Sequence, residues 1–292
     1  WSSDVCSSDL TDVAAPNRQI IITMYFRSLL IILLTVHCSL FTGVAQELRP
    51  VSNHAFIPGE KFTFTVYYDS YVTGKVTAGT ASLEVSFRRH TMEGREVYHA
   101  VGTGKSKGAF NLFFKVDDRF ESFIDTGYMV PLYFVRHTRE GSYKKDDEVK
   151  FNQFTGTASS RKANKSVPPG TQDLISAFFY ARTIDISSLN PGDYFPLNFY
   201  LDDSLYVTRV YFEGREVVMT EAGTFRCLKF KPMVAVGNVF SQSYPMSVWV
   251  TDDQYRMPVL ARSAVIVGSV KMELTRYQGL AGVPGALAGS GP

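Results

Sequence analysis

Charged side chains that could hold an anionic ligand occur in three consecutive predicted strands near the middle of the chain. Arg119 and Glu121 fall on alternate positions, which places both on one face of a strand. Arg136 belongs to the next predicted strand, and Lys144 to the strand after it. Guanidinium and ammonium groups bind carboxylates and phosphates through charge-assisted hydrogen bonds. We predict that these four residues contribute to a ligand-binding site, and the alternative is that they form cross-strand ion pairs that only stabilise the sheet.

Motifs that would indicate catalysis, a cofactor or a metal ion do not emerge from the sequence. The stretch GTGKS at 102–106 resembles a phosphate loop, but His99 stands where that motif needs its first glycine. Cys227 has no neighbouring cysteine or histidine, and there is no Gly-x-Ser-x-Gly elbow. The histidines after residue 45 lack metal-ligand spacing: His54, His90, His99 and His137. We therefore predict no catalytic residue, no cofactor and no metal site, and a protein that is not an enzyme.

A stretch with helical periodicity, about Thr171–Ile184, stands out from the strand-like sequence around it. Asp173, Ser176 and Tyr180 form a narrow polar stripe, and apolar residues occupy most of the remaining circumference. Thr171 is the predicted N-cap, and Asp173 places negative charge in the first turn. Such a wide apolar arc requires cover, so this helix either closes the core against a sheet or shapes a ligand cavity. For the second case we add Asp173 to the candidate ligand-binding residues.

Most of the chain after Phe56 has the two-residue alternation of half-buried β-strands. Phe62 and Phe64 alternate with polar residues, and Phe113–Val116 is among the further predicted strands. The Glu-Gly pairs at 93–94 and 213–214 predict turns between strands. The expected fold is all-β and mainly antiparallel. It consists of one large curved sheet, as a half-barrel or a sandwich, packed around a single central helix.

The first residues have the character of a leader. Residues 1–23 are interpreted as a non-native adapter and upstream translation, and residues 24–45 as a signal peptide. Arg27 supplies its positive charge, and its apolar run, Leu29–Val36, is too short to span a bilayer. Cleavage near Ala45/Gln46 would release an exported protein of the periplasm or the outer-membrane surface, and the alternative is lipidation at Cys38. Residues 46–278 form one β domain, followed by a disordered tail at 279–292.

The composition of the chain excludes some classes of partner and some structural features. The net charge is +2 with acidic and basic residues mixed, which is not the footprint of a nucleic-acid-binding protein. After the leader, Cys227 is the only cysteine, so the domain has no internal disulfide. No later apolar run has membrane-spanning length.

Several short motifs resemble one protein family in their order and spacing. They are Pro58–Lys61, Gly79–Ala81, Asp118–Ser122, Arg139–Lys144, Gln172–Ala177, Trp249–Asp253 and Gly268–Val270. Together they resemble the exported bacterial family called domain of unknown function 3108 (DUF3108). The resemblance implies an envelope protein of Gram-negative bacteria such as the Bacteroidetes, and it implies no catalytic residue.

Three functions follow as expectations. The first is a non-catalytic envelope protein that binds a lipid or another apolar ligand in a cavity between sheet and helix. The second is an envelope polysaccharide-binding module or hydrolase, which would use the exposed aromatic group Tyr67, Tyr68 and Tyr71 beside Asp69. The third is a structural scaffold that binds other envelope proteins through a sheet edge.

Overall fold

The computed structural model describes residues 47–71, 74–236, 239–241, 246–265 and 268–285. The predicted adapter and signal peptide, with the cleavage position, and residues 286–292 of the predicted tail lie outside the described residues.

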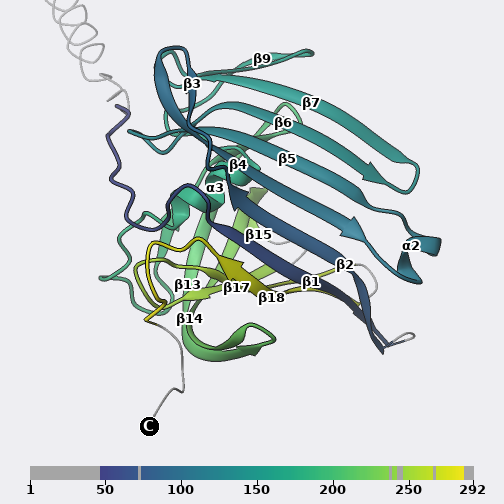
Figure 1. The fold of residues 1–292 in the computed structure, drawn as a ribbon. Coiled ribbons are helices and arrows are strands. Elements are labelled where there is room, and N and C mark those ends of the chain that lie inside the picture. The colour runs from purple at the N-terminus through teal and green to yellow at the C-terminus, as the bar shows by residue number, and fades with distance from the viewer. Residues whose placement is uncertain (1–46, 72–73, 237–238, 242–245, 266–267, 286–292) are drawn as a thin grey trace, which may run out of the picture. The chain divides into compact units, whose positions relative to one another are not determined.

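An antiparallel sheet of sixteen strands dominates the fold (Figure 1). Its first half contains β1 (Lys61–Ser70), β2 (Gly74–Val85), β3 (His90–Met92), β4 (Arg95–Ser106), β5 (Asp117–Asp125), β6 (Pro131–Glu140), β7 (Tyr143–Asn152), β8 (Thr157–Ser160) and β9 (Asn164–Ser166). Its second half contains β10 (Tyr194–Pro196), β13 (Thr208–Thr220), β14 (Gly223–Val236), β15 (Val239–Ser241), β16 (Met246–Thr251), β17 (Pro258–Ala264) and β18 (Ser269–Gln278). A separate hairpin pairs β11 (Phe199–Leu201) with β12 (Ser204–Tyr206).

The strand order is β10-β13-β14-β16-β17-β18-β1-β2-β4-β5-β6-β7-β8-β9, with β15 beside β14 and β3 beside β4. The first strand, β1, therefore pairs with the last strand, β18, and joins the two halves of the sheet. Yellow β18 runs beside dark blue β1 in Figure 1. Among the residues that the structure describes, two helices accompany the sheet: α2 (Phe110–Phe113) and α3 (Leu174–Ala181). The predicted fold class is confirmed, including one large curved sheet around the central helix α3.

Helix α3 begins three residues later than predicted and ends three residues earlier. The Asp173 carboxylate accepts hydrogen bonds from the backbone N–H groups of Ile175 and Ser176 at 2.7 and 2.8 Å. The Ser176 hydroxyl accepts the Asp173 N–H at 2.8 Å, which completes a capping box. The prediction that Thr171 caps the helix was wrong, because its hydroxyl donates instead to the Pro168 carbonyl at 2.6 Å.

Two other local predictions were wrong. The segment that includes Phe113 does not start a strand: Phe110–Phe113 forms the single helical turn of α2, and only Val116 makes an isolated bridge, to Glu140. The pair Glu213-Gly214 is not a turn, because β13 continues through it with a register shift that marks a β-bulge. Gly214 has a φ of 125°, a conformation that glycine adopts without strain.

The core lies on the face of the sheet that carries α3. Phe62 and Phe64 of β1 point into it, as their alternation predicted, and are 0% and 2% exposed. The packing continues past β18: Leu280 contacts a core cluster, Pro284 is buried, and Arg226 Nη2 donates to the Gly285 carbonyl at 2.9 Å. This first part of the predicted tail is thus placed against the domain.

Candidate ligand cavities beside α3

An apolar cavity of about 250 Å³ lies between α3 and the second half of the sheet, and we call it the α3 cavity. Phe178 and Ala181 line it from the helix. The facing wall consists of apolar side chains from β13, β14 and β16, namely Val210, Phe230, Val248 and Val250. Such a concave apolar surface favours an apolar occupant over water.

A second apolar cavity, of about 330 Å³, lies over β2, β4, β17 and β18, and we call it the β4 cavity. Leu83, Phe120, Leu260 and Met272 are among its lining residues. Phe178, Met246 and Val248 line both cavities, which are therefore neighbours on the same face of the sheet.

Two arginines touch the α3 cavity, but their charged groups already have partners. The Arg182 guanidinium is 1% exposed and donates to both carboxylate oxygens of Glu60, at 2.5 and 2.8 Å, and to the Tyr255 carbonyl. Burial raises the pKa of Glu60, although Arg182 acts in the opposite direction. Arg256 donates to the carbonyls of Arg182 and Ile184, and burial lowers its pKa. The charged groups in the wall of the α3 cavity are therefore already paired, and an apolar ligand would contact mainly apolar side chains.

Asp173, a predicted ligand-binding residue, forms a buried polar contact with β5, away from the α3 cavity. It is fully buried, and the Ser122 hydroxyl of β5 donates to its Oδ2 at 2.6 Å. Burial raises the pKa of Asp173 to about 6 despite these hydrogen bonds. Asp173 lines neither cavity, and the polar stripe that contains it and Ser176 faces the sheet.

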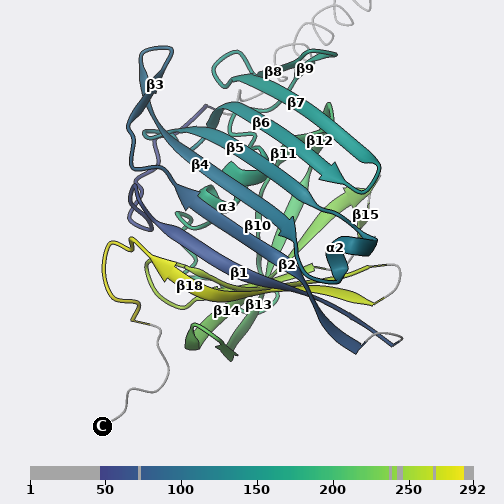
Figure 2. The same cartoon turned by 45° about the vertical axis from the view of Figure 1, so that its right-hand side comes forward.

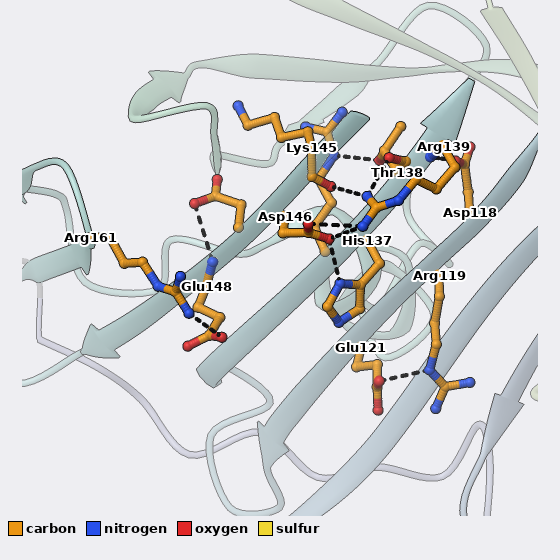
Figure 3. Close-up of polar contacts among 12 residues, drawn as sticks. Asp118, Arg119, Glu121, His137, Thr138, Arg139, Lys145, Asp146, Glu148 and Arg161 are labelled. Carbon is orange, nitrogen blue, oxygen red and sulfur yellow. Dashed lines mark hydrogen bonds and ion pairs between the residues drawn. The ribbon is translucent and has the colours of Figure 1, made fainter. Parts of the chain in front are cut away.

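The other predicted ligand-binding residues lie on opposite faces of the sheet. Arg119 is directly opposite His137, whereas Arg136 is opposite Phe120, so the two arginines point away from each other. Arg119 and Glu121 occupy the outer face, where Arg119 Nε donates to Glu121 Oε1 at 2.7 Å (Figure 3). Lys144 is exposed, and its partner across the ladder is Arg139 on the outer face. The structure does not bring these residues to one site.

The outer face carries cross-strand ion pairs of the kind expected for sheet stabilisation. His99 Nε2 lies 2.6 Å from Glu121 Oε2, and the pKa of Glu121, which burial alone would raise, is held below its usual range by Arg119 and His99. His137 Nδ1 lies 2.7 Å from Asp146, which also accepts two hydrogen bonds from Arg139 at 2.8 Å (Figure 3). These contacts match the alternative interpretation of the charged residues.

A smaller polar group on the inner face was missed by the sequence analysis. Asp118 lines the β4 cavity, is 7% exposed and accepts the Arg139 N–H at 2.8 Å. Burial and the neighbouring Asp118 carboxylate raise the pKa of Glu140. Arg136 donates to Asp202 at 3.0 Å and lies over the Phe120 ring. The available signal was the spacing of Asp118 and Phe120, which are two residues apart on β5 and therefore point to the same, inner face.

The tyrosines of the polysaccharide-binding alternative do not form one flat aromatic surface. The Lys75 ammonium lies over the Tyr67 ring at 3.9 Å, and Tyr68 contacts the Phe110 ring with centroids 6.2 Å apart. Tyr71 is fully exposed.

Comparison with known proteins assigns the family. Residues 63–275 match the model described as "Protein of unknown function (DUF3108)", and the chain belongs to this family. No curated protein sequence matches the chain. Within the described ranges, no helix has the length and apolar character needed to cross a bilayer.

One solved structure supports the fold. The chain is similar to a beta-barrel-like protein of domain of unknown function DUF1849 from Brucella abortus, with a TM-score of 0.52 and 9% identity over 77% of this chain and 98% of that one. A candidate exported protein with a YmcC-like fold from Bacteroides fragilis gives a TM-score of 0.34 and 13% identity over 79% and 99% of the two chains. A candidate lipoprotein from Parabacteroides distasonis gives 0.35 and 12% over 80% and 100%.

Proposed function

We propose that this DUF3108 protein is an exported, non-catalytic envelope protein that holds the acyl chain of a lipid in the α3 and β4 cavities. The observation that carries the proposal is the pair of neighbouring apolar cavities, which share Phe178, Met246 and Val248. The signal-peptide character of residues 24–45 supports export.

The free energy of binding would come from removing apolar surface from water. Each methylene group that leaves water contributes about 0.8 kcal/mol. Since Arg182 and Arg256 are already bonded to Glu60 and to backbone carbonyls, a hydrocarbon chain would leave no buried charge without a partner.

The polar residues beside the β4 cavity, of which Asp118 lines it and Arg136 lies over its Phe120 ring, favour a head group without negative charge. Arg136 and Lys145 both bond to Asp202, so an anionic head group would have to displace that carboxylate. Asp118 and Glu140 would also repel an anion. A hydroxyl or amide head group could donate hydrogen bonds to these carboxylates without either cost.

Binding of a fluorescent acyl probe, displaced by a monoacylglycerol or by a fatty acid of equal length, tests the proposal. Ala181→Phe places a ring in the α3 cavity and should weaken probe binding about tenfold or more, because the ring occupies the space of the chain. Val217→Phe adds the same ring at a position on β13 that is 63% exposed, and should leave binding unchanged.

The monoacylglycerol should displace the probe more effectively than the fatty acid. A folded wild-type protein that binds no acyl probe contradicts the proposal. Equal binding by wild type and the Ala181→Phe variant contradicts the assignment of the site to the α3 cavity.

A further inference from the structure

One end of the sheet carries large apolar side chains that are exposed to solvent. At the loop between β4 and β5, Leu112 is 83% exposed, Phe113 88% and Phe114 45%, and α2 has no buried residue. Figures 1 and 2 both place α2 at the end of the long strands. A contiguous group of exposed apolar residues on a folded protein usually marks an interaction surface.

The neighbouring hairpin holds this loop in place. The Gly141 N–H, in the turn between β6 and β7, donates to the Lys115 carbonyl at 2.8 Å. A Cβ atom at Gly141 would lie 3.1 Å from the Phe114 ring, so the turn and the ring are in close contact. The Val116 N–H donates to the Ser106 hydroxyl at 2.8 Å. The apolar side chains are therefore presented outward by a loop that is bonded at its base.

Positive charge surrounds the exposed apolar residues. Lys105, Lys107 and Lys115 are exposed, and no acidic residue occurs between positions 106 and 116. Lys105 pairs with Asp117 at 3.2 Å. Within the part of the chain that the structure describes, Lys107 and Lys115 have no ion-pair partner. Apolar and aromatic side chains flanked by lysines complement the interface of an anionic bilayer, where the rings enter the head-group region and the ammonium groups contact phosphates.

We propose that Leu112, Phe113 and Phe114, with Lys107 and Lys115, form a docking surface for membranes that contain anionic phospholipids. The strands of the first half of the sheet then meet the bilayer end-on. Gly104 and Asp118 line the β4 cavity directly before the last pair of the β4–β5 ladder, Lys105 and Asp117. Docking therefore brings that end of the cavity toward the lipid, although the docking surface itself does not depend on ligand binding.

Cosedimentation of the full domain with vesicles tests the docking surface. Wild type should bind vesicles of phosphatidylcholine mixed with phosphatidylglycerol, and it should bind vesicles of pure phosphatidylcholine much more weakly. The double variant Leu112→Ser and Phe113→Ser should lose about tenfold or more in affinity, because it lacks the inserting side chains. The double variant Lys107→Ala and Lys115→Ala should lose the preference for the anionic vesicles.

The matched control is Val217→Ser with Met219→Ser, which removes two exposed apolar side chains from β13, 63% and 78% exposed, and should bind as wild type does. All variants change exposed residues, so unchanged melting temperatures will confirm that they fold. The variant with Leu112→Ser and Phe113→Ser should keep acyl-probe binding, and Ala181→Phe should keep vesicle binding, which separates docking from the proposed cavity function.

Two results would overturn the proposal: wild type that binds neither kind of vesicle, or binding that is unchanged after Leu112→Ser and Phe113→Ser. Self-association of wild type through this surface without vesicle binding also overturns it, and assigns the surface to a second copy of the chain.

Discussion

Around Phe179, α3 is packed against buried apolar residues of the first half of the sheet, whereas its side toward β13, β14 and β16 borders the α3 cavity. Phe179 on the packed side is 0% exposed, and its ring centroid lies 4.8 Å from that of Phe56. Phe178, the preceding residue, is only partly buried and lines both cavities. Adjacent residues of one helix thus meet different environments.

The difference shows how an empty space can persist beside a helix. Asp173 fixes the start of α3 to β5 through Ser122, and Arg182 fixes its end to Glu60. Because both ends are held by buried polar contacts, we expect the helix to keep its position when cavity-lining side chains are changed. Anchoring and ligand binding should therefore respond to different substitutions.

The largest expected effect is on the packed side. Phe179→Ala should lower the free energy of unfolding by about 3–5 kcal/mol, because it removes a fully buried ring and leaves a cavity. Phe178→Ala should cost roughly 1 kcal/mol, since its ring is already beside empty space. Urea denaturation of both variants measures the two costs, and equal losses would contradict the asymmetry.

The next effect concerns the anchor at the start of the helix. The folded-state pKa of Asp173, about 6, lies above its usual value, so its contribution to stability is complete at low pH and is lost as the pH rises through 6. Asp173→Asn keeps an N-cap oxygen without the titration. Between pH 4 and pH 7 wild type should lose roughly 3 kcal/mol of stability relative to this variant. Parallel pH profiles of the two proteins would show that Asp173 does not titrate in this range.

A larger side chain should also cost more stability on the packed side of α3 than beside the α3 cavity. Ala100 of β4 is 0% exposed in the core cluster that contains Phe179, so Ala100→Met should overpack this core and cost about 1–3 kcal/mol. Ala181→Met extends instead into the α3 cavity, and we expect a change within about 0.5 kcal/mol. Thermal denaturation provides the comparison. A larger cost for Ala181→Met than for Ala100→Met would place the free space on the wrong side of α3.

The smallest effect is expected on the outer face. Arg119 is 47% exposed in its ion pair with Glu121, so Arg119→Ala should cost about 0.5 kcal/mol or less. It should leave acyl-probe binding unchanged, because Arg119 points away from both cavities. Weaker probe binding by this variant would revive the predicted role of Arg119 in the ligand site.

Alternation along the sequence was sufficient to predict which residues of β1 face the core, because period and burial agree at Phe62 and Phe64. It was not sufficient to place Arg119 and Arg136 relative to each other. Their faces depend on the register between β5 and β6, and a shift of one residue reverses the outcome. The same limit applies to the cavities, whose walls come from strands that are far apart in sequence.

The polar stripe of α3 illustrates a second limit. Helical periodicity indicated that Asp173 and Ser176 share a side, but not that this side faces the sheet. A partner hydroxyl, Ser122, lies 51 residues earlier, and no local pattern identifies it. The exposed rings of α2 were likewise assigned to a strand, because apolar residues usually indicate burial rather than an interaction surface.

The position of β1 between β2 and β18 has a consequence for how the chain matures. The Thr275 hydroxyl of β18 donates to the Thr63 carbonyl of β1 across 212 residues of chain. A chain that emerges N-terminus first can complete the pairing of β1 with β2 early, yet the other edge of β1 has no partner until β18 has emerged. During that interval β1 is an open template for strands of other molecules, and contacts of such high sequence separation form slowly. Truncation before Ser269 should therefore yield aggregates rather than a smaller folded domain.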